Sequence, residues 1–248
     1  MRGMSGREVK VTTFSDRGDR VRIVETPDKK LFKLNGTMFS KLNKRSVYTG
    51  DYWDYFIPLA FAFDRPRVLV LGMGGGTIPY QMGTLTKGKA SIDSVEISRR
   101  IANLARKFMP RIYGRIIVED AFDYVAKTRK KYDLVVLDVY DGALNVPKKF
   151  LGPEFIENAQ RILSDNGILA INYLKSPGNM LRFGIYKYRL RKRFRLYAIK
   201  ATMFGELTIL VCSKRFDKDR LLLRIRERFA PEKENLAVLK RYAKMKRA

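Results

Sequence analysis

Short apolar runs alternate with longer mixed stretches through the middle of the chain. The apolar runs at 67–71, 91–96, 114–118, 133–138 and 167–173 predict strands, and the stretches between them predict helices. An unbroken run such as VLVL is typical of a strand that is buried on both faces of a parallel sheet. The alternation therefore predicts an α/β fold with a doubly wound parallel sheet.

The two ends of the chain follow other patterns. Residues 1–50 alternate apolar and polar positions between turn formers, which predicts a small N-terminal antiparallel β domain with an Asn-Gly hairpin turn at 35–36. Residues 51–215 form the predicted main domain. Residues 216–248 predict a basic C-terminal helical extension, interrupted at Pro231.

Two segments of the main domain depart from simple alternation. The aromatic and apolar segment 51–63 predicts a helix packed on the sheet, and core packing and a part in a binding site are equally open for it. The runs at 194–201 and 206–213 predict an antiparallel pair at the edge of the sheet, joined through Phe204 and Gly205.

A glycine-rich turn follows the first strand of the main domain. Gly72, Gly74 and Gly76 form a GxGxG pattern, which lets the backbone bend tightly and approach a ligand with no Cβ in the way. The second strand ends about 20 residues later in Glu96, where a carboxylate accepts hydrogen bonds from ribose hydroxyls. The pattern indicates a nucleoside site. The alternative is a tight turn with no ligand and Glu96 as a solvated strand end.

Acidic residues follow two further predicted strands. These strand-end residues are Asp120 with Ala121 after the third strand, and Asp138, Tyr140 and Asp141 after the fourth. In open parallel sheets, ligands bind beyond the carboxyl ends of the strands. The glycine turn lacks the Gly-Lys-Ser/Thr of a phosphate-binding P-loop. The set instead suits a ligand with hydroxyls, amino groups and positive charge, such as S-adenosylmethionine.

The amino-acid composition limits which catalytic groups are available and where the protein is expected to be located. The 248 residues carry a net charge of +26 and no histidine, so acid–base work falls to carboxylates, lysines or tyrosines. The single cysteine excludes an internal disulfide. No apolar run approaches the roughly 18 residues of a membrane span, and the first ten residues lack a secretory pattern. We therefore expect a cytoplasmic protein with no membrane partner, and the high charge favours a thermophile.

Six stretches of the chain match one combination of motifs. They are KLNG at 33–36, VLVLGMGGGT at 68–77, VEI at 95–97, EDA at 119–121, YDLVVLDVYDG at 132–142 and VPKKFLGPEF at 146–155. Together they resemble the spermidine synthase family of polyamine aminopropyltransferases, within the Rossmann-like methyltransferase superfamily. The resemblance covers roughly residues 20–215. It implies a transferase with a methyltransferase-type doubly wound sheet behind a small N-terminal β domain.

The resemblance also implies roles for the strand-end residues. Glu96 would bind the ribose, Asp120 with Ala121 would contact adenine, and Asp138 would be the catalytic base. Asp141, with Tyr140, would hold a small-molecule amine. The co-substrate would be decarboxylated S-adenosylmethionine or S-adenosylmethionine itself, with no metal, and we expect a homodimer.

The chain departs from the family pattern at several positions of the group-transfer half of the site. Gly75 stands where the family's glycine turn carries an aspartate, Phe39 where it has a glutamine, and Gly142 where a proline follows the D-x-x-D loop. The nucleoside half of the pattern is complete, and the substrates of the chain are therefore expected to differ from those of typical members.

Three functions remain open, and we favour aminopropyl transfer to an amine. The first rival is an S-adenosylmethionine-dependent methyltransferase, possibly on nucleic acid, since Gly75 leaves no carboxylate to repel that of the cofactor. The second is a nucleic-acid-binding protein with a vestigial pocket. The segment 182–197 interleaves Arg and Lys with Phe and Tyr, which predicts weak nucleic-acid binding through the basic C-terminal third. A solvated face of a thermophilic protein is the alternative for this segment.

Overall fold

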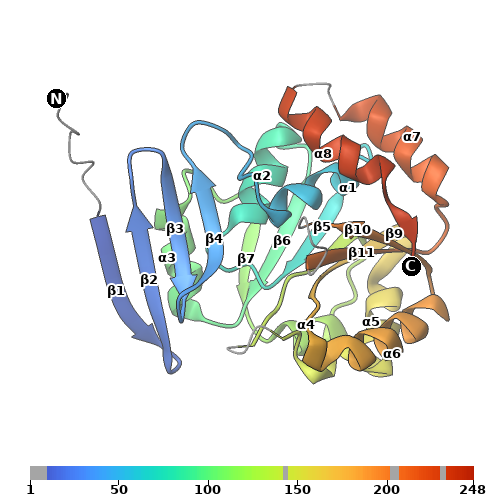
Figure 1. Ribbon diagram of the computed structural model, residues 1–248, viewed down its shortest axis with the longest axis horizontal. Coiled ribbons are helices and arrows are strands. Elements are labelled where there is room, and N and C mark those ends of the chain that lie inside the picture. Colours follow the sequence, from blue (N-terminus) through green and yellow to red (C-terminus); the bar gives the residue numbers. More distant parts are fainter. Residues whose placement is uncertain (1–9, 142–144, 202–206, 230–232) are drawn as a thin grey trace.

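The computed structural model describes residues 10–141, 145–201, 207–229 and 233–248, and these contain two β-sheets (Figure 1). The smaller sheet is an antiparallel meander, in the order β1 (Lys10–Asp16), β2 (Asp19–Glu25), β3 (Lys29–Leu34) and β4 (Thr37–Asn43). The predicted N-terminal antiparallel sheet is thus confirmed.

The hairpin turn between β3 and β4 is also confirmed. Asn35 and Gly36 both have positive φ, 48° and 86°, which is the conformation that a two-residue hairpin requires of its central pair. The Asn35 side chain accepts the main-chain N–H of Arg20 at 2.8 Å and donates to Asp19 at 2.6 Å. The turn is therefore fixed to the neighbouring strand.

The larger sheet has eight strands in the order β12-β10-β11-β9-β8-β5-β6-β7. Five of them are parallel: β5 (Arg67–Leu71), β6 (Ser91–Glu96), β7 (Arg115–Val118), β8 (Tyr132–Leu137) and β9 (Leu163–Leu174). The other three are antiparallel to their neighbours: β10 (Arg195–Lys200), β11 (Leu207–Ser213) and β12 (Lys246–Arg247). The doubly wound α/β prediction is confirmed.

Both faces of the larger sheet are covered by helices, as the apolar strands require. Val68 and Val70 of β5 point into one core, and Leu69 and Leu71 point into the other. The first core is covered by α1 (Ile57–Ala60), α2 (Thr77–Leu85), α7 (Lys218–Arg228) and α8 (Lys233–Ala243). The second is covered by α4 (Ala121–Lys127), α5 (Pro153–Ile162) and α6 (Met180–Arg191), seen below the sheet in Figure 1.

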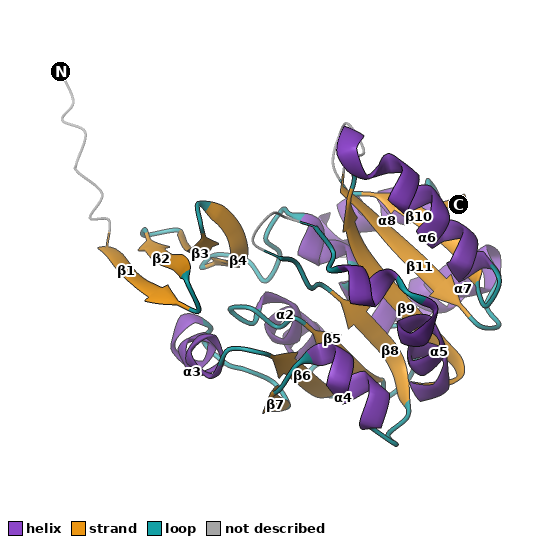
Figure 2. Ribbon diagram, turned by 90° about the horizontal axis from the view of Figure 1, so that it is seen from below, coloured by secondary structure: helices purple, strands orange, loops and turns teal. Residues whose placement is uncertain are grey.

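Helix α3 (Arg99–Phe108) joins the two sheets. Its Ile101 and Phe108 pack with Phe32 of β3, and Ala102 and Ala105 on its other side pack with Met73 of the glycine turn. The smaller sheet is thereby held beside the carboxyl end of the larger one (Figure 2).

Two segments differ from the sequence-based expectation. The helix expected over 51–63 is two short helices, η1 (Tyr52–Tyr55) and α1, because the burial of Trp53, Phe56 and Ile57 sets the path of the chain rather than helical propensity. At the other end, β10 and β11 form the expected antiparallel pair, but β12 lies outside them as the edge strand. Their connection at Phe204 and Gly205, and the break at Pro231, lie outside the described residues, and the domain boundaries stay a prediction.

A buried carboxylate fixes the segment that connects the two sheets. Asp54 is 4% exposed and accepts four hydrogen bonds. Its oxygens receive the main-chain N–H groups of Thr49 and Gly50 at 2.9 and 2.7 Å, the Thr49 hydroxyl at 2.8 Å and the Gln81 amide at 2.6 Å. Asp54 thus closes the connecting segment on itself through Thr49 and Gly50 and attaches it to helix α2 through Gln81.

We predict that Asp54→Ala destabilises the protein by about 2–4 kcal/mol, since three buried donors and one partly buried donor lose their acceptor together. Chemical denaturation measures the change. The matched control is Asp51→Ala, which removes a carboxylate whose side chain is one third exposed and pairs with Lys41 at 2.7 Å. It should cost less than about 1 kcal/mol. Equal losses in the two variants would contradict the assigned role of Asp54.

Candidate active site

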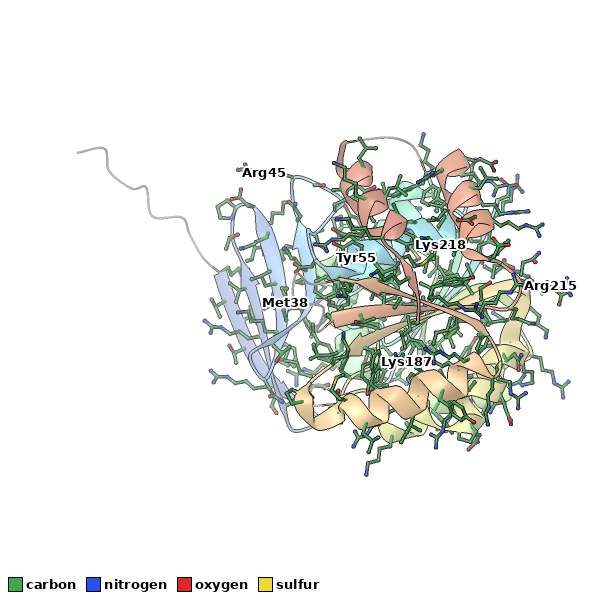
Figure 3. The ribbon with its side chains drawn as sticks, turned by 45° about the vertical axis from the view of Figure 1, so that its right-hand side comes forward. Met38, Arg45, Tyr55, Lys187, Arg215 and Lys218 are labelled. Atoms are coloured by element: carbon green, nitrogen blue, oxygen red, sulfur yellow. The ribbon has the colours of Figure 1, made fainter. Side chains whose placement is uncertain are left out.

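A cavity of about 510 Å³ lies between the smaller sheet and the carboxyl ends of the parallel strands. Its floor is built from the ends of β5, β6, β8 and β9, where the strand-end residues named by the sequence gather. One wall comes from the smaller sheet, including Thr37, Met38 and Phe39 of β4; Figure 3 labels Met38 on that sheet. The predicted residues Gly72, Gly74, Glu96, Asp120, Ala121, Asp138, Tyr140 and Asp141 all line it.

The glycine turn depends on positive φ angles and on close approaches. Gly72 has φ 83°, and a Cβ there would collide with the main-chain oxygen of Asp138. Gly74 has φ 54° and faces the cavity. Gly76, with φ 91°, is the N-cap of helix α2 and does not line the cavity. A Cβ at Gly76 would collide with the side chain of Ile112. Gly76 therefore shapes the turn, whereas Gly72 and Gly74 border the ligand space.

Glu96 is buried at the end of β6 and braces the glycine turn. One carboxylate oxygen accepts the N–H of Gly74 at 3.0 Å, and the other accepts the N–H of Ser98 at 3.0 Å. Burial raises the pKa of Glu96, although these main-chain donors oppose the shift. Each oxygen retains a second lone pair, so the carboxylate is still able to accept from a ligand in the cavity.

Asp120 and Ala121 form the start of helix α4 at another part of the cavity. The Asp120 side chain accepts the N–H of Phe122 at 2.8 Å as the N-cap and pairs with Lys149 at 2.6 Å. Partial burial alone would raise the pKa of Asp120, but the Lys149 ammonium and the N-cap bond together hold it below its ordinary value. Asp120 is therefore ionised at neutral pH.

Asp138 is the half-buried carboxylate at the end of β8. Its oxygens accept the amide of Asn172 at 2.8 Å and the hydroxyl of Tyr52 at 3.2 Å. Burial raises the pKa of Asp138 to about 6, against the opposing hydrogen bonds of Asn172, Tyr52 and Trp53. At pH 7 about nine tenths of such a group is ionised, and it is a much stronger base than an ordinary aspartate.

Tyr140 and Asp141 follow Asp138 on the loop after β8. Burial raises the pKa of Tyr140 well above its ordinary value, and the Asp138 charge adds to the shift. Asp141 is exposed at the cavity edge, and its side chain accepts the N–H of Asn145 at 2.8 Å. The two carboxylates of the loop thus border one cavity, with Asp138 the more enclosed.

The cavity is acidic although the chain as a whole is basic. Its lining contains two cations, Arg17 and Lys149, and six carboxylates: Asp16, Asp19, Glu96, Asp120, Asp138 and Asp141. Asp16 and Asp19 belong to the hairpin of β1 and β2, which the sequence did not connect with the site. A local excess of carboxylates favours a cationic or hydroxyl-rich ligand.

Four further residues of the site were not identified from the sequence. Tyr52 and Asn172 hold Asp138, Lys149 holds Asp120, and Ser40 accepts the N–H of Gly75 at 2.7 Å. Asn172 carried a signal, since it is a polar residue in the apolar strand GILAINY and is 1% exposed. Ser40 and Lys149 carried none, because their partners are distant in sequence.

Comparisons with known proteins agree with this geometry. The family model described as "Spermine/spermidine synthase domain" matches residues 57–179. A polyamine aminopropyltransferase of Clostridium botulinum is 30% identical over 176 residues, which are 66% of this chain and 59% of that relative. Over its central part the chain is therefore similar to the spermidine synthase family. The matched part spans about three fifths of that relative's length.

Solved structures share the fold of this chain. A probable spermidine synthase from Corynebacterium glutamicum superposes with a TM-score of 0.73 at 19% identity, covering 87% of this chain and 86% of that one. Human methyltransferase-like protein 13 in complex with SAH superposes at 0.60 and 21% identity, covering 80% of this chain and 94% of that one. The fold is therefore common to both classes of transferase. Among the described residues, no cluster suited to a metal ion occurs, and no helix has the length and apolarity to cross a membrane.

The pKa of Asp138 is about 6 in the folded protein, and its ordinary value is 3.8. Between these two pH values Asp138 is protonated in the folded state but ionised in the unfolded state, so stability falls as pH rises. We predict that this group lowers stability by up to about 3 kcal/mol as pH rises from 4 to 7. Asp138→Asn should remove that part of the dependence, measured by urea unfolding at several pH values.

The control for this measurement is Asp141→Asn, which changes an exposed carboxylate of the same loop and should leave the wild-type pH dependence in place. A pH dependence equal in wild type and Asp138→Asn would show that Asp138 is not held in its protonated form by the fold.

Proposed function

We propose that the chain is a transferase of the spermidine synthase type, which moves an aminopropyl group from decarboxylated S-adenosylmethionine to a small amine. Similarity to the spermidine synthase family supports the class of reaction. The observation that carries the proposal for this chain is the Asp138 carboxylate, enclosed at the end of β8, held by Asn172 and Tyr52, and with a pKa of about 6.

The reaction requires a base at such a position. The amine nitrogen attacks the carbon attached to the sulfonium, the carbon–sulfur bond breaks, and its electron pair stays on sulfur to give methylthioadenosine. The nitrogen must lose a proton, and a primary ammonium has a pKa near 10. Asp138 orients the amine and accepts that proton, and Asp141 with Tyr140 binds the amine beside it.

The other end of the cavity suits the nucleoside. Glu96 accepts from the two ribose hydroxyls through the lone pairs that Gly74 and Ser98 leave available. Asp120 and Ala121 contact the adenine, with Gly72 and Gly74 allowing close approach of the backbone. The acidic lining attracts a sulfonium and an amine despite the overall positive charge, because charges beyond about 10 Å are largely screened.

An S-adenosylmethionine-dependent methyltransferase is the second candidate, and Gly75 favours it. A Cβ at Gly75 would come within 2.9 Å of the Ser40 Cβ, so the aspartate of the family pattern does not fit here without a shift of β4. Without that carboxylate the cavity has less to repel the carboxylate of S-adenosylmethionine. The choice between the two co-substrates is therefore the main question of specificity.

Further expectations about partners and setting stay predictions. They are a homodimer, a cytoplasmic location in a thermophile, and weak nucleic-acid binding through the basic C-terminal third. A nucleic-acid-binding protein with a vestigial pocket is the third candidate, and the retained set of Glu96, Asp120, Asp138 and Asp141 argues against it.

Removal of the Glu96 carboxylate tests the nucleoside half of the site. Glu96→Gln should weaken methylthioadenosine binding by about 1.5–3 kcal/mol, the range for a hydrogen bond to a charged group. Isothermal titration calorimetry measures the affinity, and the same titration with the two co-substrates tells which form is preferred. Unchanged methylthioadenosine affinity in the variant would remove Glu96 from the nucleoside site.

Kinetics of two neighbouring variants test the group-transfer half. Asp138→Asn keeps the size of the side chain but removes the base, so turnover should fall by about 10²–10⁴-fold with little change in nucleoside affinity. Asp141→Asn should mainly raise the apparent KM for the amine. Steady-state assays with a panel of diamines and triamines measure both.

The wild type itself decides between the candidates. If it turns over no polyamine but transfers a methyl group from S-adenosylmethionine, the aminopropyl proposal fails and the methyltransferase takes its place. Binding of neither co-substrate would leave only the vestigial pocket.

A further inference from the structure

A second cavity lies at the opposite edge of the larger sheet from the candidate active site. It has a volume of about 390 Å³ and is lined by residues at the C-terminal end of α6, the start of β10, the segment after β11, and β12. Arg195 of β10 pairs in register with Ser213 of β11, which pairs with Ile168 in the first half of β9. The cavity is therefore at the amino edge of the parallel strands, and the active-site cavity is at their carboxyl edge.

This basic cavity is lined by five cationic side chains, and none of the other described residues that line it is acidic. The five are Arg191, Arg193, Arg195, Lys214 and Arg247. Arg191, Arg193 and Arg195 are close together in the sequence, whereas Lys214 and Arg247 are distant from them. All five line one cavity because β10, β11 and β12 are adjacent in the sheet. Like charges gathered in one concave space repel one another, and an anion bound there would reduce that repulsion.

The protein neutralises only part of this charge. Arg193 pairs with Glu157 at 2.5 Å, and Arg191 donates to the main-chain oxygen of Ala248 at 2.5 Å. Arg195 donates to the main-chain oxygen of Arg215 at 3.0 Å, which fixes its guanidinium and leaves other N–H groups available. The Lys214 and Arg247 side chains make no hydrogen bond or ion pair to any described residue.

The surface next to the cavity is also basic and carries an exposed aromatic ring. Helix α6 leads into it with Lys187, Tyr188 and Lys192, and Tyr188 is 60% exposed with the Lys192 ammonium 4.6 Å from its ring centroid. An exposed aromatic ring among cations offers a stacking surface for a base beside contacts for phosphates. Figure 3 labels Lys187 on α6 and shows Arg215, which follows Lys214, at the outer edge of the molecule.

We propose that the basic cavity binds the phosphates of a single-stranded nucleic acid, whose chain continues along α6. The cations line a concave space, which suits a phosphodiester chain entering it and not a flat lipid surface. The extension along α6 fits a polymer better than a small anion. This binding is separate from the proposed transfer reaction, because the two cavities share no lining residue.

Neutralisation of the two unpaired cations tests the proposal. Binding of a fluorescent 20-nucleotide poly(dT) is measured by anisotropy over a salt series, with wild type, Lys214→Gln/Arg247→Gln, and Arg106→Gln/Lys107→Gln. The last is the matched control, because it removes one Arg and one Lys that are exposed on α3, far from the cavity (Figures 1 and 2). Thermal unfolding and methylthioadenosine binding check that each variant is folded.

The wild type should bind, and log K should fall linearly with log salt concentration. The cavity variant should lose at least about 10-fold in affinity in low salt, with a slope smaller by about 1.4, or 0.7 for each of two phosphate contacts. The control should stay within about 2-fold of wild type.

Three results would overturn the proposal. One is no binding by the wild type at low salt. Another is an equal loss in the control, which would mean that diffuse surface charge binds the oligonucleotide. The third is that tripolyphosphate, or a vesicle with anionic lipid, binds the wild type as tightly as the oligonucleotide and loses the same affinity in the cavity variant. That outcome would assign the cavity to a small anion or a lipid surface.

Discussion

The close approach of Gly72 to the main chain of Asp138 is the constraint on which the candidate active site depends. The turn after β5 passes so near the end of β8 that a Cβ at Gly72 would collide with the Asp138 main-chain oxygen. The N–H of Asp138 in turn donates to the Leu71 oxygen at 2.9 Å. Because the turn and the strand end are in contact, the glycine-lined ligand space and the carboxylate of Asp138 belong to one cavity.

The pKa values of Asp120 and Asp138, two carboxylates of this cavity, are shifted in opposite directions. Asp120 pairs with Lys149 and keeps a pKa below its ordinary value, whereas Asp138 has only neutral partners and burial raises its pKa to about 6. A carboxylate without a cationic partner is free to take a proton near neutral pH. The fold thus keeps Asp120 ionised and raises the proton affinity of Asp138, in the same cavity.

The active-site cavity and the basic cavity carry charges of opposite sign. The active-site cavity gathers six carboxylates at the carboxyl edge of the parallel strands, although the chain carries +26. The basic cavity gathers five cations at the amino edge. An overall net charge therefore says little about what either site binds, because a ligand within a cavity responds to the nearest charges while more distant ones are screened.

The sequence by itself determined the strand and helix alternation, the antiparallel N-terminal sheet and the strand-end residues Glu96, Asp120 and Asp138, since these follow from local periodicity and from the rule that ligands bind at the carboxyl ends of parallel strands. The resemblance to the spermidine synthase family was also evident from the motifs. Only the tertiary structure decided that Asn172 and Tyr52 hold Asp138, that Ser40 occupies the space beside Gly75, and that Lys214 and Arg247 line one cavity. These contacts join residues far apart in the chain, and their geometry depends on packing between elements, which no local pattern encodes.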